Sequence, residues 1–359
     1  MARVSFNWIS GRFRINSLYL VVALVVFGAV VFILFRGHGG LPQEASAGGT
    51  VHEANSVRDS VEPASSVANE TRPQPGVPSP ALSQPQPGLP SIVGSASAPV
   101  ADSEPNPTVA NILSQAIALK QSQPGRIIEA RNNLNDALKL PMSLPQRKAV
   151  KDEMAKLADD WLFGPAVFAG DTLCETYMVK RGDLLQVIGR RQKVPYEILM
   201  GINNISRPES LQAGRAIKIA KGPFHAKVYR STFTLDLYLQ DTYVRSFTVG
   251  LGKPGYETPT GIWRVQENGK LIQPPWTDPD TGRLYKSADP DYPLGSRWIA
   301  LDGLEGQAKD RTGFAIHGTK APEQIGTAGS RGCIRMFNGD AVLMFNLLIP
   351  VYSRVEIVD

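Results

Sequence analysis

Residues Ile15–Phe35 form an uninterrupted run that contains no charged side chain. At a rise of about 1.5 Å per residue, a helix of this length spans the hydrocarbon core of a bilayer. The alternative is a cleaved signal peptide, although the apolar part of such a peptide is usually shorter. Both interpretations export the residues that follow. We expect a single-pass transmembrane helix over 15–35. This segment therefore cannot be part of a soluble domain.

Basic residues are distributed unevenly around this run. Arg3, Arg12 and Arg14 precede it, whereas only Arg36 follows closely. Flanking Lys and Arg residues tend to stay in the cytoplasm. We therefore expect residues 1–14 to form a cytoplasmic tail and all that follows Arg36 to lie in the periplasm or cell wall.

Residues 37–106 are rich in Pro, Ser, Ala, Gly and Gln, with little apolar material to bury. Such a composition cannot offset the entropy lost on folding, so we expect a disordered linker. The whole chain has a net charge of +5 and a pI of about 9.1, but no long basic run of the kind that binds nucleic acid. A weakly anionic polymer is the more natural partner.

The inventory of metal-ligating side chains is small. Two cysteines, Cys174 and Cys333, and four histidines occur, without the spacing of a known metal motif. A G-x-G-x-x-G match at 250–255 includes Pro254 and sits among turn residues, whereas the dinucleotide fingerprint must open a helix. We expect no metal and no cofactor.

Residues 107–165 carry apolar side chains at helical spacing, for example Val150, Met154, Leu157 and Trp161. Prolines interrupt the pattern, which predicts a small α-helical region of two or three packed helices. A spacer or docking bundle is the preferred interpretation, and a specific binding function is the alternative.

Residues 177–220 predict the order β-α-α-β. The segment begins with Y-x-V-x-x-G-D-x-L from Tyr177, has an Asn-Asn turn after its second helix, and closes with L-x-x-G-x-x-I-x-I from Leu211. It resembles a LysM domain over its full length. The resemblance implies binding to N-acetylglucosamine-containing glycan, here the peptidoglycan backbone, and the loops that it implicates contain Gly182, Asp183, Asn203 and Asn204.

Residues 224–359 alternate apolar and polar side chains, which predicts a mostly-β domain. A helix is expected over Asp340–Leu348 and a last strand over Arg354–Val358.

The chemistry of this domain is concentrated in two segments. An apolar strand ends at His317, and a loop returns the chain to Ser330-Arg331-Gly332-Cys333. A thiol of ordinary pKa is mostly protonated at neutral pH, so a cysteine nucleophile requires a base or cation nearby. His317 supplies the base, and Arg331 and Arg335 are expected to favour the thiolate. Gly332 allows close backbone approach, and backbone N–H groups there could form an oxyanion hole.

Residues 226–358 resemble the YkuD family of L,D-transpeptidases. The shared motifs are V-G-L-G with T-P-T-G at 249–261, P-L-G-x-R-W at 293–298, I-H-G-T at 316–319 and S-R-G-C-I-R-M at 330–336. The resemblance implies a mostly-β, sandwich-like fold. It also implies the site residues: Cys333 as nucleophile, His317 as base, Ser330 as their support and Arg335 as a polar neighbour. Arg331 departs from the commonest pattern, which has a second His there.

The resemblance implies a cross-linking reaction in which the cysteine attacks a stem tetrapeptide, D-Ala leaves, and an amine of a neighbouring stem attacks the thioester. An L,D-carboxypeptidase that hands the same acyl-enzyme to water is one alternative. A non-catalytic peptidoglycan-binding anchor is another, although the presence of both His317 and Cys333 argues against it.

Overall fold

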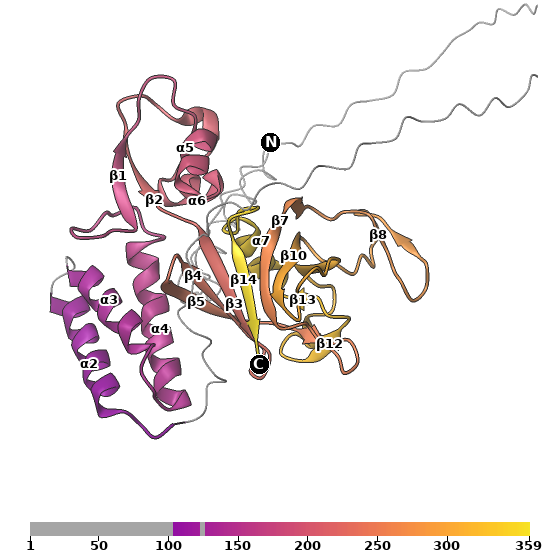
Figure 1. Cartoon of the computed structure of the whole chain (residues 1–359). Helices are drawn as coiled ribbons and strands as arrows, with labels where there is room; N and C mark the ends of the chain where they lie inside the picture. Colours follow the sequence, from indigo (N-terminus) through magenta and orange to yellow (C-terminus); the bar gives the residue numbers. More distant parts are fainter. Residues whose placement is uncertain (1–102, 123–125) are drawn as a thin grey trace, which may run out of the picture. The chain divides into compact units, whose positions relative to one another are not determined.

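The computed structural model describes residues 103–122 and 126–359 (Figure 1). The predictions for the tail 1–14, the span 15–35 and the linker up to residue 102 lie outside these described residues. Within the described ranges, no helix combines the length and the apolar character needed to cross a membrane.

The helical region contains three helices: α2 (Pro107–Ser122), α3 (Ile127–Ala137) and α4 (Leu144–Trp161). Helix α4 begins at a capping box, in which Ser143 and Gln146 satisfy each other's backbone N–H groups. Leu134, Met154 and Leu157 are fully buried between the helices. The predicted helical region is confirmed.

The next segment has the predicted βααβ order. It comprises β1 (Cys174–Met178), α5 (Leu185–Gln192), α6 (Tyr196–Ile202), a 3-10 turn η2 (Pro208–Ser210) and β2 (Ala216–Ala220). Strands β1 and β2 pair antiparallel, with Cys174 opposite Ala220. Leu185, Ile188 and Leu199 cover the inner face of this pair and are buried, so the two short helices and the two-stranded sheet share one core.

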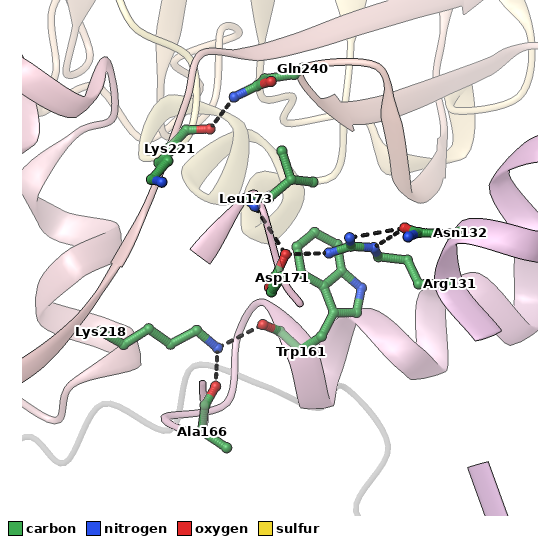
Figure 2. A network of polar contacts seen from close by, with 9 residues as sticks. All are labelled: Arg131, Asn132, Trp161, Ala166, Asp171, Leu173, Lys218, Lys221 and Gln240. Carbon is green, nitrogen blue, oxygen red and sulfur yellow. Dashed lines mark hydrogen bonds and ion pairs between the residues drawn. The ribbon is translucent and has the colours of Figure 1, made fainter. Parts of the chain in front are cut away.

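A buried polar network joins this segment to the helical region (Figure 2). The Lys218 ammonium donates to three carbonyl oxygens at and just after the end of α4, those of Trp161 (2.6 Å), Gly164 (2.8 Å) and Ala166 (2.6 Å). The Arg131 guanidinium forms a buried ion pair with Asp171 (2.8 Å). Because each buried charge has partners, the junction avoids the desolvation penalty of an unpaired ion.

The C-terminal domain is built on one eight-stranded sheet in the order β13-β11-β10-β7-β14-β3-β4-β5, and Figure 1 shows its long strands side by side. The strands are β3 (Phe224–Tyr229), β4 (Thr234–Leu239), β5 (Thr242–Thr248), β7 (Gly261–Leu271), β10 (Trp298–Gly306), β11 (Phe314–His317), β13 (Ile334–Arg335) and β14 (Arg354–Val358). The expected mostly-β domain and its last strand are confirmed. The expected helix begins and ends slightly earlier, as α7 (Asn338–Phe345).

The sandwich-like arrangement that the resemblance implied is replaced by a single curved sheet. Irregular register in β4–β5 and at two points in β7–β10 bends the strands. The two ends of the sheet then meet where Gly250, just after β5, pairs with Arg335 of β13 through N–H···O bonds of 2.9 and 2.8 Å. The result is a half-barrel whose core includes Trp263, Val265 and Ile299.

Four shorter strands and one turn complete the domain. Strand β6 (Leu251–Gly252) pairs with β12 (Ala328–Ser330), β8 (Trp276–Thr277) pairs with β9 (Leu284–Tyr285), and the 3-10 turn η3 is Pro322–Gln324. The β6–β12 pair is parallel. It places Ser330 at the entrance to the loop that leads to β13.

Helix α4 also contacts the edge strand β5 and its neighbour β4. Lys151 pairs with the fully buried Asp236 of β4 (2.6 Å), and Arg245 of β5 pairs with Asp159 (2.6 Å). The helical region is therefore docked on the half-barrel. The interpretation of this region as a spacer or docking bundle, rather than a specific binding domain, stays a prediction.

Candidate active site

The sheet brings the two chemical segments of the C-terminal domain together. Strand β13 pairs parallel with β11, so that Ile334 lies opposite Ile316 and Arg335 opposite His317. Cys333 immediately precedes β13. Its half-buried side chain lies with Sγ 3.9 Å from the Gly313 carbonyl oxygen. The predicted cysteine thus lies at the start of the strand that neighbours the histidine strand, although a loop separates the two residues in the chain.

Ser330 and Gly332 shape the turn that carries the cysteine. The buried Ser330 hydroxyl donates to the Cys333 carbonyl oxygen (2.6 Å) and accepts from the Gly332 N–H (3.1 Å). Gly332 has φ +103°, and a Cβ there would lie 2.6 Å from Cε1 of Phe314. Only glycine fits this backbone without strain, so the predicted supporting roles of both residues have a geometric basis.

His317 is buried at the end of β11, where its ring stacks on Trp298 with centroids 5.5 Å apart. Its Nδ1 lies 2.6 Å from the Gly318 carbonyl oxygen. Because a carbonyl can only accept, Nδ1 carries the proton, which leaves the lone pair on Nε2. Burial lowers the pKa of His317 to about 4. The imidazole is therefore neutral at physiological pH and available as a base.

The expectation that neighbouring positive charge favours the Cys333 thiolate holds for Arg335, but burial has the larger effect on the pKa of this thiol. Burial raises the pKa of the Cys333 thiol, against the lowering effects of a hydrogen bond from the Ala315 backbone and of the Arg335 charge. The site at rest holds a neutral thiol and a neutral imidazole. Activation of the sulfur then requires proton transfer when a substrate arrives.

The two arginines beside the cysteine are held by other partners. Arg331 forms an ion pair with Asp280, in the hairpin between β8 and β9, and lies 5.5 Å from the centre of the Tyr256 ring. Arg335 donates to the side chain of Gln324 and, at 3.4 Å, to the Gly329 carbonyl. Asp280 is distant from Arg331 in the chain, whereas Gln324 and Gly329 lie 11 and 6 residues before Arg335. No sequence pattern indicated Asp280 or Gln324.

Asn338, the first residue of α7, also shapes the site, although the sequence analysis did not predict it. Its side-chain oxygen accepts from the N–H groups of Ser296 (3.0 Å) and Thr319 (3.2 Å), and its side-chain nitrogen donates to the Thr319 carbonyl (2.9 Å). It therefore ties the loop after His317 to the loop before Trp298. An Asn a few residues after the cysteine, at a helix start, was the available signal.

The predicted glycan-contact residues lie in the loops of the βααβ segment. Gly182 adopts φ +86° at a turn. The Asp183 carboxylate accepts from the Tyr177 hydroxyl and the Lys180 N–H, both at 2.8 Å. These bonds lower its pKa.

The two asparagines of the next turn differ in exposure. Asn203 is buried, and its amide bonds to Leu199 and to both backbone groups of Lys218. Asn204 is exposed with φ +53°. Asn203 thus holds α6 to β2, and sugar contact by any of these residues stays a prediction.

In residues 103–122 and 126–359, no three His, Cys, Asp or Glu side chains come together as a metal-binding group. The expectation that the chain uses neither metal nor cofactor stays a prediction.

Comparison with known families and relatives matches both modules. The profile of the L,D-transpeptidase catalytic domain (YkuD) matches residues 223–357, and that of the LysM domain matches residues 177–220. YkuD of Bacillus subtilis strain 168, named as an L,D-transpeptidase, is 29% identical over 188 residues, which cover 51% of this chain and 98% of that protein.

Two further relatives carry the same family name. YqjB of Bacillus subtilis strain 168 is 34% identical over 132 residues, which cover 37% of this chain and 69% of YqjB. ErfK/SrfK of Escherichia coli K12 is 36% identical over 127 residues, which cover 32% of this chain and 37% of that protein. The chain belongs to the L,D-transpeptidase family: it is a cysteine transpeptidase in which a LysM domain precedes a YkuD catalytic domain.

Proposed function

We propose that the protein forms peptidoglycan cross-links through a thioester between Cys333 and a stem peptide. One observation carries this proposal. Cys333 is the only cysteine in the matched catalytic segment 223–357, and it precedes Arg335, the strand partner of His317, by two positions. A cysteine transpeptidase needs a thiol and a base in reach of each other, and this pair supplies both.

In the first half-reaction, Nε2 of His317 accepts the Cys333 proton as Sγ attacks the stem-tetrapeptide carbonyl that precedes the terminal D-Ala. The tetrahedral intermediate collapses, and the imidazolium returns the proton to the departing amine. One C–N bond breaks and one C–S bond forms. D-Ala leaves, and a thioester remains.

In the second half-reaction, a side-chain amine of a neighbouring stem attacks the thioester. His317 removes a proton from the attacking amine and returns it to sulfur as the C–S bond breaks. The new amide joins the third residues of two stems, and the neutral thiol and imidazole are restored. Because each step begins from neutral groups, the raised thiol pKa is compatible with turnover.

The residues around the pair have supporting roles in this proposal. Ser330 holds the Cys333 carbonyl and the Gly332 N–H, which fixes the turn that presents Sγ. Arg335 contributes positive charge beside the sulfur and so favours the thiolate as it forms. Arg331 acts by joining the nucleophile loop to the β8–β9 hairpin through Asp280. An Arg at this position cannot serve as a second base.

The decisive experiment incubates the full chain with a purified disaccharide-tetrapeptide and separates the products by mass. We expect a dimer that has lost one alanine per cross-link. Release of tripeptide alone would instead establish an L,D-carboxypeptidase. Unchanged substrate, with the protein still retained on sacculi, would establish a binding anchor.

We also propose that the LysM domain holds the enzyme on the glycan strands of its substrate. Asn204 is an exposed residue of the predicted contact region. Because Asn204 already has φ +53°, replacing it by Gly removes the amide without straining the turn.

Asn204→Gly is expected to weaken retention on isolated sacculi while leaving turnover of small soluble muropeptides unchanged. Asn268→Gly is the matched control, since Asn268 is also exposed at positive φ, in the catalytic domain. The measurement is the fraction of each variant that pellets with sacculi. Equal pelleting of both variants and the parent would count against glycan contact at this turn.

We propose that the chain is anchored by residues 15–35 with its catalytic domain outside the cytoplasm, as the arginine distribution in the sequence suggests. An alkaline phosphatase fused after Gly40 is expected to be active, because that enzyme requires an oxidising compartment for its disulfides. An inactive fusion that is present at normal abundance would contradict this orientation.

A further inference from the structure

We propose that Asn338 is a positioning residue of the reaction, which holds the two loops that frame His317 and thereby sets the tautomer and the direction of its imidazole. The proposal rests on the proposed function, in which His317 is the base. It gives a role to a residue that neither the sequence motifs nor the family match assigns.

The contacts of Asn338 reach across the site. Its Oδ1 accepts from the Thr319 N–H (3.2 Å) and the Ser296 N–H (3.0 Å), and its Nδ2 donates to the Thr319 carbonyl (2.9 Å). Its own backbone carbonyl accepts from the Ser296 hydroxyl (3.0 Å). Four hydrogen bonds thus connect the start of α7 to both loops at once, over sequence separations of 42 and 19 residues.

The backbone of both loops is shaped to admit this side chain. A Cβ at Gly295 or at Gly318 would collide with Oδ1 of Asn338. Gly295 also has φ +66°, a conformation that disfavours other residues. The two glycines therefore allow the Asn338 amide to lie directly against the backbone of both loops.

Both loops act directly on His317. The Gly318 carbonyl accepts the Nδ1 proton, and the backbone of Leu294 lies near enough to the ring to raise the pKa of His317 against the larger effect of burial. Gly318 precedes Thr319, and Leu294 lies close to Ser296, so Asn338 bonds beside each of these contacts. If the Gly318–Thr319 segment rotated, Nδ1 would lose its acceptor and the proton could move to Nε2, the position that must stay free to act as a base.

An ordinary helix cap does not explain this arrangement. The residue before α7 is Phe337, whose side chain has no hydrogen-bond acceptor. The side-chain amide of Asn338 hydrogen-bonds the two loops. The segment that carries the nucleophile also continues directly to Asn338. A single stretch of chain therefore positions both the sulfur and, through the loops, the base.

The test compares Asn338→Ala with the parent full chain, using nitrogen-15 NMR of protein labelled at its four histidines. The His317 signal is assigned by its absence in His317→Ala. The parent is expected to show the tautomer with its proton on Nδ1, and Asn338→Ala a mixture of both tautomers. We expect kcat to fall by roughly 10- to 100-fold, the range known for residues that orient metal-binding histidines through hydrogen bonds, with KM unchanged.

Two further variants make the result specific. Ser296→Ala removes only the bond to the Asn338 carbonyl, and should produce a smaller change in the same direction even if Asn338→Ala folds poorly. Asn135→Ala is the control, because its amide also bonds backbone groups of two residues, Asp241 (3.3 Å) and Tyr243 (3.0 Å), but away from the site. It should leave the tautomer and kcat unchanged.

The outcomes separate this proposal from the function on which it rests. A parent enzyme that forms no product contradicts the proposed function, while the tautomer remains measurable. A parental tautomer and kcat in folded Asn338→Ala would overturn the positioning role. Changes in Asn135→Ala as large as those in Asn338→Ala would overturn it too, since they would reflect general loosening.

Discussion

Replacement of Cys333 by Ala is expected to abolish turnover and acyl-enzyme formation, whereas Cys174→Ala should leave both intact. Cys333 is half-buried beside β11, the strand that ends at His317. Cys174 is buried in β1, where desolvation raises the pKa of its thiol to about 12. Reactivity follows thiolate character and access, so only Cys333 can form the thioester.

The measurement is intact mass after exposure to a carbapenem, whose strained β-lactam carbonyl is an acyl donor. The parent and Cys174→Ala should gain one adduct, and Cys333→Ala none. An adduct at full occupancy in Cys333→Ala, or one mapped to Cys174 in the parent, would overturn the site assignment and with it the thioester mechanism.

His317→Ala is expected to keep the thiol in place yet lower kcat by roughly two to four orders of magnitude, the usual scale of a lost general base. His317 must be neutral to accept a proton, and burial holds its pKa at about 4. In the parent, kcat/KM should therefore decrease only as pH falls through about 4, not through the ordinary histidine pKa near 6.5. A pH profile of soluble muropeptide turnover measures this.

His225→Asn is the matched control for the histidine prediction. His225 is also buried with its pKa lowered to about 4, but its Nδ1 accepts from the Arg354 N–H on the neighbouring strand (3.1 Å). Asn retains an acceptor there, and parental turnover is expected. If kcat/KM of the parent instead decreased as pH fell through about 6.5, His317 would be more hydrated than its buried position implies.

Much of the fold could be predicted because it depends on local pattern. The βααβ segment combines a strand period, two helix starts and an Asn turn within a short stretch. The last strand, Arg354–Val358, has clear alternation and agrees with the structure. Cys333 and His317 were predicted as nucleophile and base because the I-H-G-T and S-R-G-C-I-R-M motifs surround these two rare residue types.

The remainder depends on tertiary contacts. The single curved sheet follows from bulges in β7–β10 and from the Gly250–Arg335 bridge, neither of which alters the period of the pattern. Whether the pKa of Cys333 is raised or lowered depends on the balance between burial, which raises it, and the Arg335 charge, which lowers it. Local sequence shows the arginine but not the burial.

The Asn338 bonds illustrate the same limit. They join segments that are far apart in the chain, and an isolated Asn at a helix start resembles many others. Only the folded chain shows which side chain bridges the two loops.

The Lys218 network has a consequence for cooperativity in unfolding. Lys218 lies in the last strand of the LysM domain, is 2% exposed, and depends on the carbonyl groups of Trp161, at the end of α4, and of Gly164 and Ala166, which follow the helix. If α4 and the residues that follow it unfolded first, the ammonium would lose all three of its carbonyl acceptors, and the LysM domain would lose the contacts that hold this strand against the helical region. Neither module can loosen alone at low cost, so the two should denature in a single transition. Proteolysis between Trp161 and Cys174 should therefore destabilise the LysM domain, although no residue of the domain is cut.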